Sequence, residues 1–314
     1  MKILTRDKEN VHVYIDANNA PKMRVSPGEL FCVETIRADN NFLNHDNPVF
    51  RDHKHVMNVL ANPVTGPVYV EGAEPGDRIA VTIEDIRLGD NGSEGYYTYV
   101  PGQGLFANHY VPEAFPPKTY FCDVTRETVT FYTGVKNIEL PAQPFIGTIC
   151  VAMKNDRTLS YNANKEMVGN QDCSHFKKGS TLVMPVNVPG ALLSVGDLHA
   201  MQGDGEMFGC AIEAEGQVTF SIQLIKKIDP RYFNWPQIDG NGRFGCLCTV
   251  SNNIEAAVRA AVHDVIKRIE IDKGMPFMEA YMLIGQCVKV QICQMMHGLC
   301  TAYAYLDQKL VDSL

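Results

Sequence analysis

The sequence predicts a mainly β protein: an antiparallel β-sandwich or jelly-roll-like architecture that ends in a C-terminal αα-hairpin. Residues 11 to about 155 contain many short runs separated by Pro, Gly, Asn and Asp, which is typical of antiparallel strands rather than of alternating βα units. No glycine-rich loop leads from a strand into a helix, so neither a dinucleotide site nor a P-loop is supported. Helical spacing of apolar residues dominates only near the C-terminus.

The clearest strands are expected at 28–35, 66–71 and 78–86. In the last of these, Ile79, Val81 and Ile83 alternate with other residues and should share one face. A Pro-Gly pair at 75–76 predicts the turn before it. Further strands are expected at 128–133, 145–152, 180–186, 207–214 and 217–225. The stretch 89–117 has little pattern, which is typical of a lid or an interface loop.

Two helices are expected at the C-terminal end. Asn252-Asn253-Ile254-Glu255 supplies an N-cap and an acidic first turn, and Gly274 closes that helix. Pro276 begins a second helix, which we expect to run to about His297. We therefore divide the chain into a β-sandwich core, residues 1–230, and a C-terminal part, residues 231–314, whose two helices pack on the core or at a dimer interface.

Composition and charge exclude several classes of protein. The net charge of −8, with no basic patch, argues against binding to nucleic acid or to an anionic membrane surface. No apolar run approaches the ~18 residues of a membrane span. Charged residues follow the first three apolar positions too soon to leave the apolar region of a signal peptide. The ten cysteines lie mostly in apolar surroundings, as free thiols do in a reducing compartment. We therefore expect a cytoplasmic protein.

The most informative segment lies at 196–206, between two apolar, strand-like stretches. It contains five side chains that can bind a metal ion or move a proton: Asp197, His199, Gln202, Asp204 and Glu206. The spacing of Asp197 and His199 places both on one face of an extended strand. Carboxylates at the edge of a core need partners or a metal. The segment therefore predicts a metal-binding or catalytic site, and the alternative is a hydrogen-bonded structural turn.

A second polar cluster lies upstream at 168–176 and offers Asn170, Asp172 and His175. A strand at 180–186 and a turn at 188–191 separate the two clusters, so we expect two adjacent strands to bring them together. Two histidines with several carboxylates suit Zn²⁺, whereas an all-oxygen subset suits Ca²⁺ or Mg²⁺. Cys173 is interpreted as a neighbour of this site; the alternative is a catalytic nucleophile beside His175.

Three stretches of the chain carry a resemblance to a known family. They are residues 62–77, Gly169-Asn170-x-Asp172-x-x-His175, and Gly196-Asp197-x-His199-Ala200-x-Gln202-Gly203-Asp204-Gly205-Glu206. With these motifs the chain resembles the acetamidase/formamidase family over nearly its whole length, and its length is similar to that of the shorter, acetamidase-like branch. Val168 stands where family members usually carry a second glycine, which leaves the preferred substrate open.

The resemblance implies an amidohydrolase that acts on linear, non-peptide amide bonds. It would hydrolyse a small neutral carboxamide, such as formamide or acetamide, to a carboxylate and ammonia. This reaction needs an activated water, a stabilised oxyanion and a proton for the leaving amine. A divalent metal supplies the first two. We expect Zn²⁺, with Ca²⁺ at the same or a second site as the alternative.

Roles within this site follow from the chemistry of the side chains. We assign the metal ligands first to Asp172, Asp197 and His199, and then to His175, Gln202 and Asp204. Glu206 is the first choice for the general base and Glu213 the second, because a carboxylate beside an apolar strand can have a raised pKa. Asn170 is expected to donate a hydrogen bond to the oxyanion or to orient the substrate.

Two other functions stay open. A hydrolase of the same architecture could act on another amide or on a cyclic imide. A non-catalytic, metal-stabilised dimer could use the polar clusters only to hold strands together. The resemblance and the Met-rich terminal helices also predict a homodimer or a higher homo-oligomer, with no nucleic-acid or membrane partner.

Overall fold

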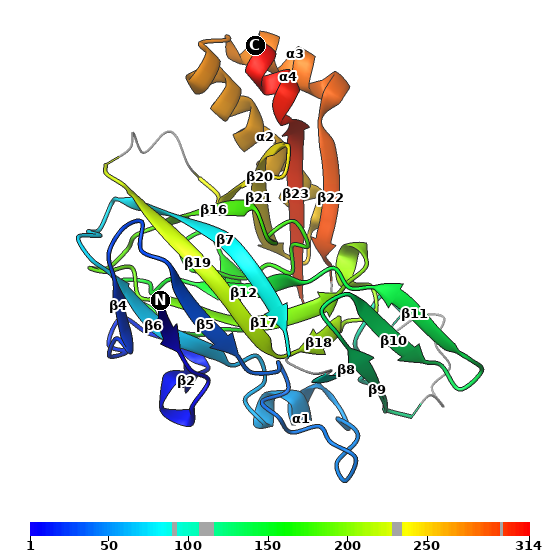
Figure 1. Ribbon diagram of the computed structural model, residues 1–314. Helices are drawn as coiled ribbons and strands as arrows, with labels where there is room; N and C mark the ends of the chain where they lie inside the picture. The colour runs from blue at the N-terminus through cyan, green and yellow to red at the C-terminus, as the bar shows by residue number, and fades with distance from the viewer. Residues whose placement is uncertain (90–92, 107–115, 228–233, 296–297) are drawn as a thin grey trace.

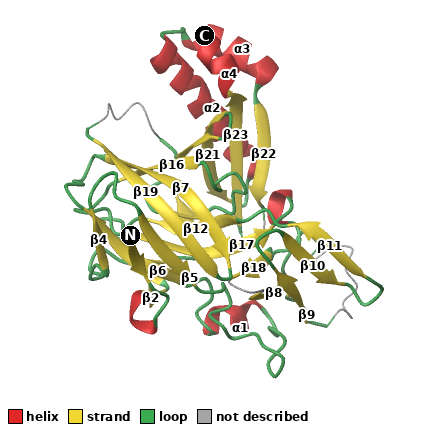
Figure 2. Cartoon of the chain, viewed as in Figure 1, coloured by secondary structure: helices red, strands yellow, loops and turns green. Residues whose placement is uncertain are grey.

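The structure is a computed structural model that describes residues 1–89, 93–106, 116–227, 234–295 and 298–314. Strands form most of the molecule, and the longer helices gather at one end of it (Figure 1, Figure 2). The predicted mainly β, antiparallel architecture is confirmed. None of the helices within these ranges combines the length and the apolarity that a membrane crossing requires.

Two large sheets contain most of the described strands. The first sheet has the order β1 (Lys2–Leu4), β5 (Phe31–Thr35), β19 (Gly216–Ile225), β7 (Arg78–Leu88), β16 (Ser180–Pro185), β20 (Gln237–Gly240), β21 (Arg243–Ser251), β23 (Leu299–Asp307) and β22 (Lys289–Gln294). The second has the order β11 (Asn137–Pro141), β10 (Thr128–Tyr132), β9 (Lys118–Val124), β8 (Ser93–Tyr99), β18 (Ile212–Ala214), β17 (Leu193–Met201), β12 (Phe145–Cys150), β15 (Val168–Asn170) and β14 (Ala163–Asn164).

Further strands and the helices complete the described elements. β6 (Val64–Val70) pairs with β17, β2 (Val11–His12) and β4 (Met23–Val25), and β3 (Tyr14–Ile15) pairs with β13 (Thr158–Leu159). The helices are α1 (His53–Asn58), α2 (Ile254–Lys273), α3 (Phe277–Cys287) and α4 (Gln308–Ser313), with the 3₁₀ turns η1 (Lys8–Asn10) and η2 (Asp204–Glu206).

One hydrophobic core joins the two sheets and follows the predicted alternation. Ile79, Val81 and Ile83 of β7 are fully buried. They belong to one apolar cluster with Phe220 of β19 and with Leu198 of β17, in the second sheet. Successive side chains of a strand point to opposite faces, so every second residue from Ile79 to Ile83 enters this core. The core thereby anchors β17, the strand that also carries the polar motif.

Two predicted elements differ from the structure. The strand expected at 207–214 is reduced to β18, because η2 and the turn after it occupy the preceding residues. The stretch 89–117 is not all loop, since β8 forms within it and pairs with β9. Its residues 90–92 and 107–115 lie outside the described residues.

The C-terminal hairpin forms, but its second helix is shorter than predicted. α2 begins after Asn253, whose side chain accepts from the backbone N–H of Ala256 at 2.9 Å, and ends at Gly274 with φ 65°. α3 ends at Cys287, and β22 follows it. Val290 and Ile292 in β22 alternate with polar residues, a period of two that favours a strand. β20 to β23 continue the first sheet beyond β16.

Candidate active site

Neighbouring strands of the second sheet bring the polar clusters together. β12 lies between β15 and β17 and pairs antiparallel with both. Asp197 and His199 lie on β17, and Asp172 follows the end of β15. On the other side of β17, Glu213 of β18 stands opposite His199. The two clusters therefore meet across β12 rather than on adjacent strands as predicted, because the strand between them in sequence, β16, belongs to the first sheet.

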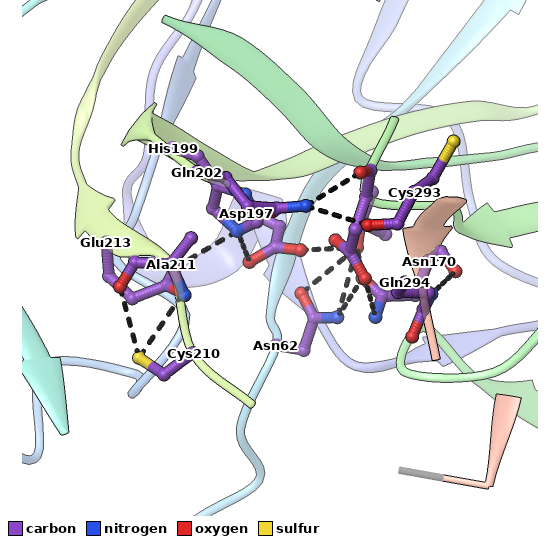
Figure 3. Close-up of polar contacts among 12 residues, drawn as sticks. Asn62, Asn170, Asp197, His199, Gln202, Cys210, Ala211, Glu213, Cys293 and Gln294 are labelled. Atoms are coloured by element: carbon purple, nitrogen blue, oxygen red, sulfur yellow. Dashed lines mark hydrogen bonds and ion pairs between the residues drawn. The ribbon is translucent and has the colours of Figure 1, made fainter. Parts of the chain in front are cut away.

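His199 lies at the centre of the cluster. Its Nε2 is 3.1 Å from Asp197 Oδ1 and 3.4 Å from Glu213 Oε2. The candidate ligand atoms form two overlapping groups, each within 4.8 Å: Asp172, Asp197 and His199, and His199, Glu206 and Glu213. All of these residues are buried. Figure 3 shows Asp197 and His199 between Glu213 on one side and Asn170 on the other.

Gly147 of β12 leaves the space in which these side chains converge. A Cβ at this position would lie 2.5 Å from Asp197 Oδ2, 2.6 Å from Asp172 Oδ1 and 2.9 Å from His199 Cε1. Real Cβ atoms essentially never approach other atoms so closely. A glycine at position 147 of β12 is therefore required for the two aspartates and the histidine to meet.

Several buried atoms of the cluster have no hydrogen-bond partner in the structure. They include Asp172 Oδ1, Glu206 Oε2 and His199 Nδ1. Because buried polar atoms are normally paired, unpaired carboxylate and imidazole atoms within one buried cluster indicate a ligand position. Carboxylate oxygens together with an imidazole nitrogen form a donor set that divalent cations such as Zn²⁺ bind. The residues present therefore fit a metal centre.

Burial and mutual repulsion perturb the charges of this cluster. Burial raises the pKa of Glu206 to about 7 and that of Glu213 to about 8. Burial, followed by the nearby Glu206 and Asp197, raises the pKa of Asp172 well above its ordinary value. Burial favours the neutral forms of Asp197 and His199, but their mutual attraction and hydrogen bond lower the pKa of Asp197 and, with Glu213, raise that of His199. Such perturbed groups are typical of functional sites.

The backbone is also unusual at the acidic residues. The φ angles of Asp172, Asp197 and Glu206 are 48°, 57° and 47°. Few non-glycine residues adopt this left-handed region. Residues held there by the surrounding structure cluster at active sites, where the conformation aims a side chain. Three acidic residues of one cluster share this feature, which supports a functional arrangement.

Comparison with known proteins assigns the family. The Acetamidase/Formamidase family model matches residues 2–167 and 150–303. The chain belongs to the acetamidase/formamidase family. It is similar to the crystal structures of acetamidases from Bacillus halodurans (28% identity, 99% of each chain covered, TM-score 0.87) and Yersinia enterocolitica (29% identity, 99% of this chain and 92% of that one, TM-score 0.87). The resemblance that the motifs carry is thus confirmed.

Curated sequence relatives agree with this assignment. An acetamidase from Mycolicibacterium smegmatis is 30% identical over 260 residues, which cover 64% of this chain and 63% of that protein. The chain spans about three fifths of the length of the curated relatives it matches, 61–63%.

In this family member a small cavity of about 70 Å³ adjoins the cluster. Its polar lining includes Asn170, Asp197, Glu206 and Glu213. Its apolar lining includes Phe50, Val56, Tyr96 and Val100. The cavity therefore gives a small molecule, rather than a polymer, access to Asp197, Glu206 and Glu213 of the cluster.

The structure does not bring every predicted ligand into the two groups. Gln202 uses its Nε2 to donate to the backbone oxygens of Asp172 and Cys293, each at 3.0 Å. Asp204 is exposed and accepts from Gln291. His175 packs against Tyr303, with a ring-centroid distance of 5.0 Å, and burial lowers its pKa to about 4.

Two neutral residues of the site were missed by the sequence analysis. Asn62, before β6, and Thr148, on β12, are both buried and hydrogen-bond to one another beside Asp197. Asn62 belongs to the first of the family-like stretches, so its position in a motif was visible but its role was not. Thr148 lies in an apolar strand with no nearby polar pattern, and nothing in the sequence distinguishes it.

Proposed function

We propose that this chain is a metal-dependent amidohydrolase that converts a small carboxamide, such as formamide or acetamide, to a carboxylate and ammonia. The buried group of Asp172, Asp197 and His199, whose candidate ligand atoms lie within 4.8 Å of one another, carries the proposal. Relatives named acetamidase and formamidase support the choice of substrate class.

Asp172, Asp197 and His199 are the proposed metal ligands. A bound divalent ion lowers the pKa of a water ligand to about 7 and polarises a carbonyl oxygen. We propose Zn²⁺, because imidazole nitrogen combined with carboxylate oxygen is a common zinc ligand set. Ca²⁺, which takes about six to eight oxygen ligands, is the alternative for the acidic part of the cluster.

Glu206 is the proposed general base. Its Oε2 has no hydrogen-bond partner in the structure, the residue lines the cavity, and its pKa of about 7 lies near a working pH. Glu213 is the second candidate, because its Oε1 already accepts from the backbone N–H of Ala211 at 3.2 Å. Glu213 Oε2 is likewise without a hydrogen-bond partner, but it lies 3.4 Å from His199 Nε2, so we place Glu206 first.

Asn170 is proposed to act on both the site and the substrate. Its Nδ2 donates to Asp172 Oδ2 at 2.9 Å, so one N–H orients that carboxylate. The amide nitrogen has a second N–H, and the residue lines the cavity. We propose that this second donor orients the carbonyl oxygen of the substrate.

The cavity favours a small and neutral substrate. Its volume of about 70 Å³ admits an acyl group of only a few atoms. The carboxylate of Asp197 in its lining, whose pKa is lowered, stays ionised and would repel an anion. The proposed substrates are therefore unbranched primary amides with short acyl groups.

An ammonia-release assay tests this function. The purified chain is incubated with formamide, acetamide and butyramide, before and after removal of metal by a chelator and after addition of Zn²⁺. We expect ammonia from the two short amides, loss of activity on chelation and recovery with Zn²⁺. A metal-loaded protein that releases no ammonia from any of the three amides would rule out the proposal.

The last proposals concern the oligomeric state of the protein, its division into two parts and its location. We propose a homodimer, or a higher homo-oligomer, because the outer face of α3 exposes Met278, Tyr281 and Met282 by 59%, 52% and 68%. Residues 1–230 form the proposed amidase core with every acidic residue of the cluster, and residues 231–314 provide the helical part. All ten cysteines are free thiols, which supports a reducing, cytoplasmic environment.

A further inference from the structure

We propose that Asn62 and Thr148 are positioning residues that orient both aspartate ligands through one branched hydrogen-bond network. The inference rests on the proposed metal site, and it adds a role for two neutral side chains that act through the aspartates, one of which, Asn62, also lines the cavity. The network starts at the amide of Asn62 and ends at the carboxylates of Asp172 and Asp197. Its branches pass through Asn170 and Thr148.

Thr148 is placed where it can reach the aspartate of β17. It lies on β12, opposite Gly196 of β17 on one side and Asn170 of β15 on the other. Its hydroxyl lies within hydrogen-bonding reach of Asn170 Oδ1, of Asn62 Oδ1 at 3.3 Å and of Asp197 Oδ2 at 3.0 Å. A hydroxyl has one proton to donate, and an ionised carboxylate is the strongest acceptor within reach. Thr148 therefore fixes one oxygen of Asp197.

Asn62 supplies both branches of the network. Its Nδ2 lies 3.0 Å from Thr148 Oγ1 and 3.0 Å from Asn170 Oδ1, and it has one N–H for each. Because Asn170 uses its oxygen to accept from Asn62, its Nδ2 is turned toward Asp172 Oδ2, 2.9 Å away. The orientation of the Asn170 amide, and with it the orientation of Asp172, depends on Asn62. Figure 3 shows Asn62 beside Asn170 and Asp197.

The backbone holds Asn62 firmly in this position. Its φ angle is 62°, a conformation that asparagine tolerates better than most residues. Its backbone N–H donates to Ala38 O at 2.6 Å, and its backbone oxygen accepts from the hydroxyl of Ser160. With the residue only 3% exposed, water does not compete for its amide. The donor is thus fixed before any ligand binds.

The network has a direct consequence for metal binding. Asp172 keeps Oδ1 without a hydrogen-bond partner, while Oδ2 is held by Asn170. The carboxylates therefore face His199 without having to rotate when an ion binds. Loss of such outer hydrogen bonds typically costs about 10–100-fold in metal affinity.

Metal affinity of matched threonine variants tests the proposal. Zn²⁺ affinity is measured on folded, metal-free protein by competition with a chromophoric chelator. We expect Thr148→Val, which keeps the shape and removes the donor, to weaken binding about 10–100-fold, and Thr148→Ser to restore it to within a few-fold of wild type. Thr82→Val is the control: it removes a hydroxyl bond of 2.8 Å to Thr181, between β7 and β16 of the first sheet, and should leave the affinity unchanged.

Asn62→Asp provides a second test with a side chain of nearly the same shape. It still tests the network if the Thr148→Val protein does not fold. It removes both N–H donors, so we expect a larger loss of affinity than in Thr148→Val. Wild-type affinity in both Thr148→Val and Asn62→Asp would overturn the positioning role while leaving the proposed function intact. A wild-type protein that binds no Zn²⁺ would overturn both, and the two failures are thus distinguishable.

Discussion

Three acidic side chains of the site share one arrangement: each gives one oxygen to a neutral donor and turns the other toward its neighbours. Asp172 receives its hydrogen bond from Asn170, Asp197 from Thr148 and Glu213 from the backbone of Ala211. Neutral donors orient a carboxylate without cancelling its charge. The second oxygen of each side chain can therefore turn toward a neighbour or toward a cation.

Substitution of single residues should separate ligands from the base. Asp197→Asn and His199→Ala should lose both metal and activity, because they remove a ligand. Glu206→Gln should retain the ion and the fold but slow turnover by about 10²–10⁴-fold. Metal content and ammonia release are measured on the same samples. If Glu206→Gln loses its metal as readily as Asp197→Asn, Glu206 is a ligand and Glu213 becomes the better candidate for the base.

The stability of the metal-free protein should fall as the pH rises from 5.5 to 8. The pKa values of Glu206 and Glu213 are raised from 4.5 to about 7 and about 8, so the folded state holds protons that the unfolded state has released. Stability decreases with pH wherever the folded state binds more protons. We expect a lower Tm at pH 8 than at pH 5.5 for chelator-treated protein, and a smaller decrease in Glu206→Gln. Equal decreases in the two proteins would contradict the raised pKa of Glu206.

At this scale the sequence predicts the charged residues and misses the neutral ones. Asp197 and His199 are recognisable because they lie two residues apart in a motif between apolar stretches. Thr148 lies 49 residues from its partner Asp197, and Asn62 lies 108 residues from Asn170. Those contacts arise only when β12 comes to lie between β15 and β17, which no local pattern reveals.

At the scale of an element, β12 must lack a side chain at Gly147. Gly147→Ala should displace Asp172 and Asp197 and weaken Zn²⁺ binding by at least about tenfold, with a loss of about 1–3 kcal/mol in stability from overpacking. Gly203→Ala is the matched control in the segment 196–206, because a Cβ there meets nothing within 4 Å. Metal affinity and the free energy of unfolding are compared for both variants. Unchanged affinity in Gly147→Ala would show that the two aspartates do not converge over β12.

Two C-terminal elements show when a local sequence pattern is enough to predict secondary structure. α2 is predicted correctly because Asn253 caps its start and Gly274 its end. The segment after Cys287 was expected to stay helical, since its apolar residues also fit a helical period. It instead forms β22, where pairing with the edge of β23 satisfies its backbone groups. That choice depends on a neighbouring strand and not on the segment itself.

At the scale of the whole molecule, the exposed apolar face of α3 predicts self-association. Light scattering at low protein concentration should report at least twice the chain mass of 34.9 kDa. Tyr281→Asp combined with Met282→Glu should shift the mass toward that of one chain, because both side chains lie in the exposed patch. Val135→Glu, at a position 93% exposed in a turn, is the control and should leave the mass unchanged. A wild-type protein with the mass of one chain would show that the exposed face of α3 does not form an interface between copies.

We propose that the buried Asp172, Asp197 and His199 bind the ion on which amide hydrolysis depends. The most direct measurement titrates metal-free protein with Zn²⁺ and follows both bound ion per chain and ammonia released from acetamide. We expect activity to rise in proportion to bound ion and to reach its plateau when the site is filled, and we expect Asp197→Asn to show neither binding nor activity. Full activity in protein shown to contain no metal would contradict it.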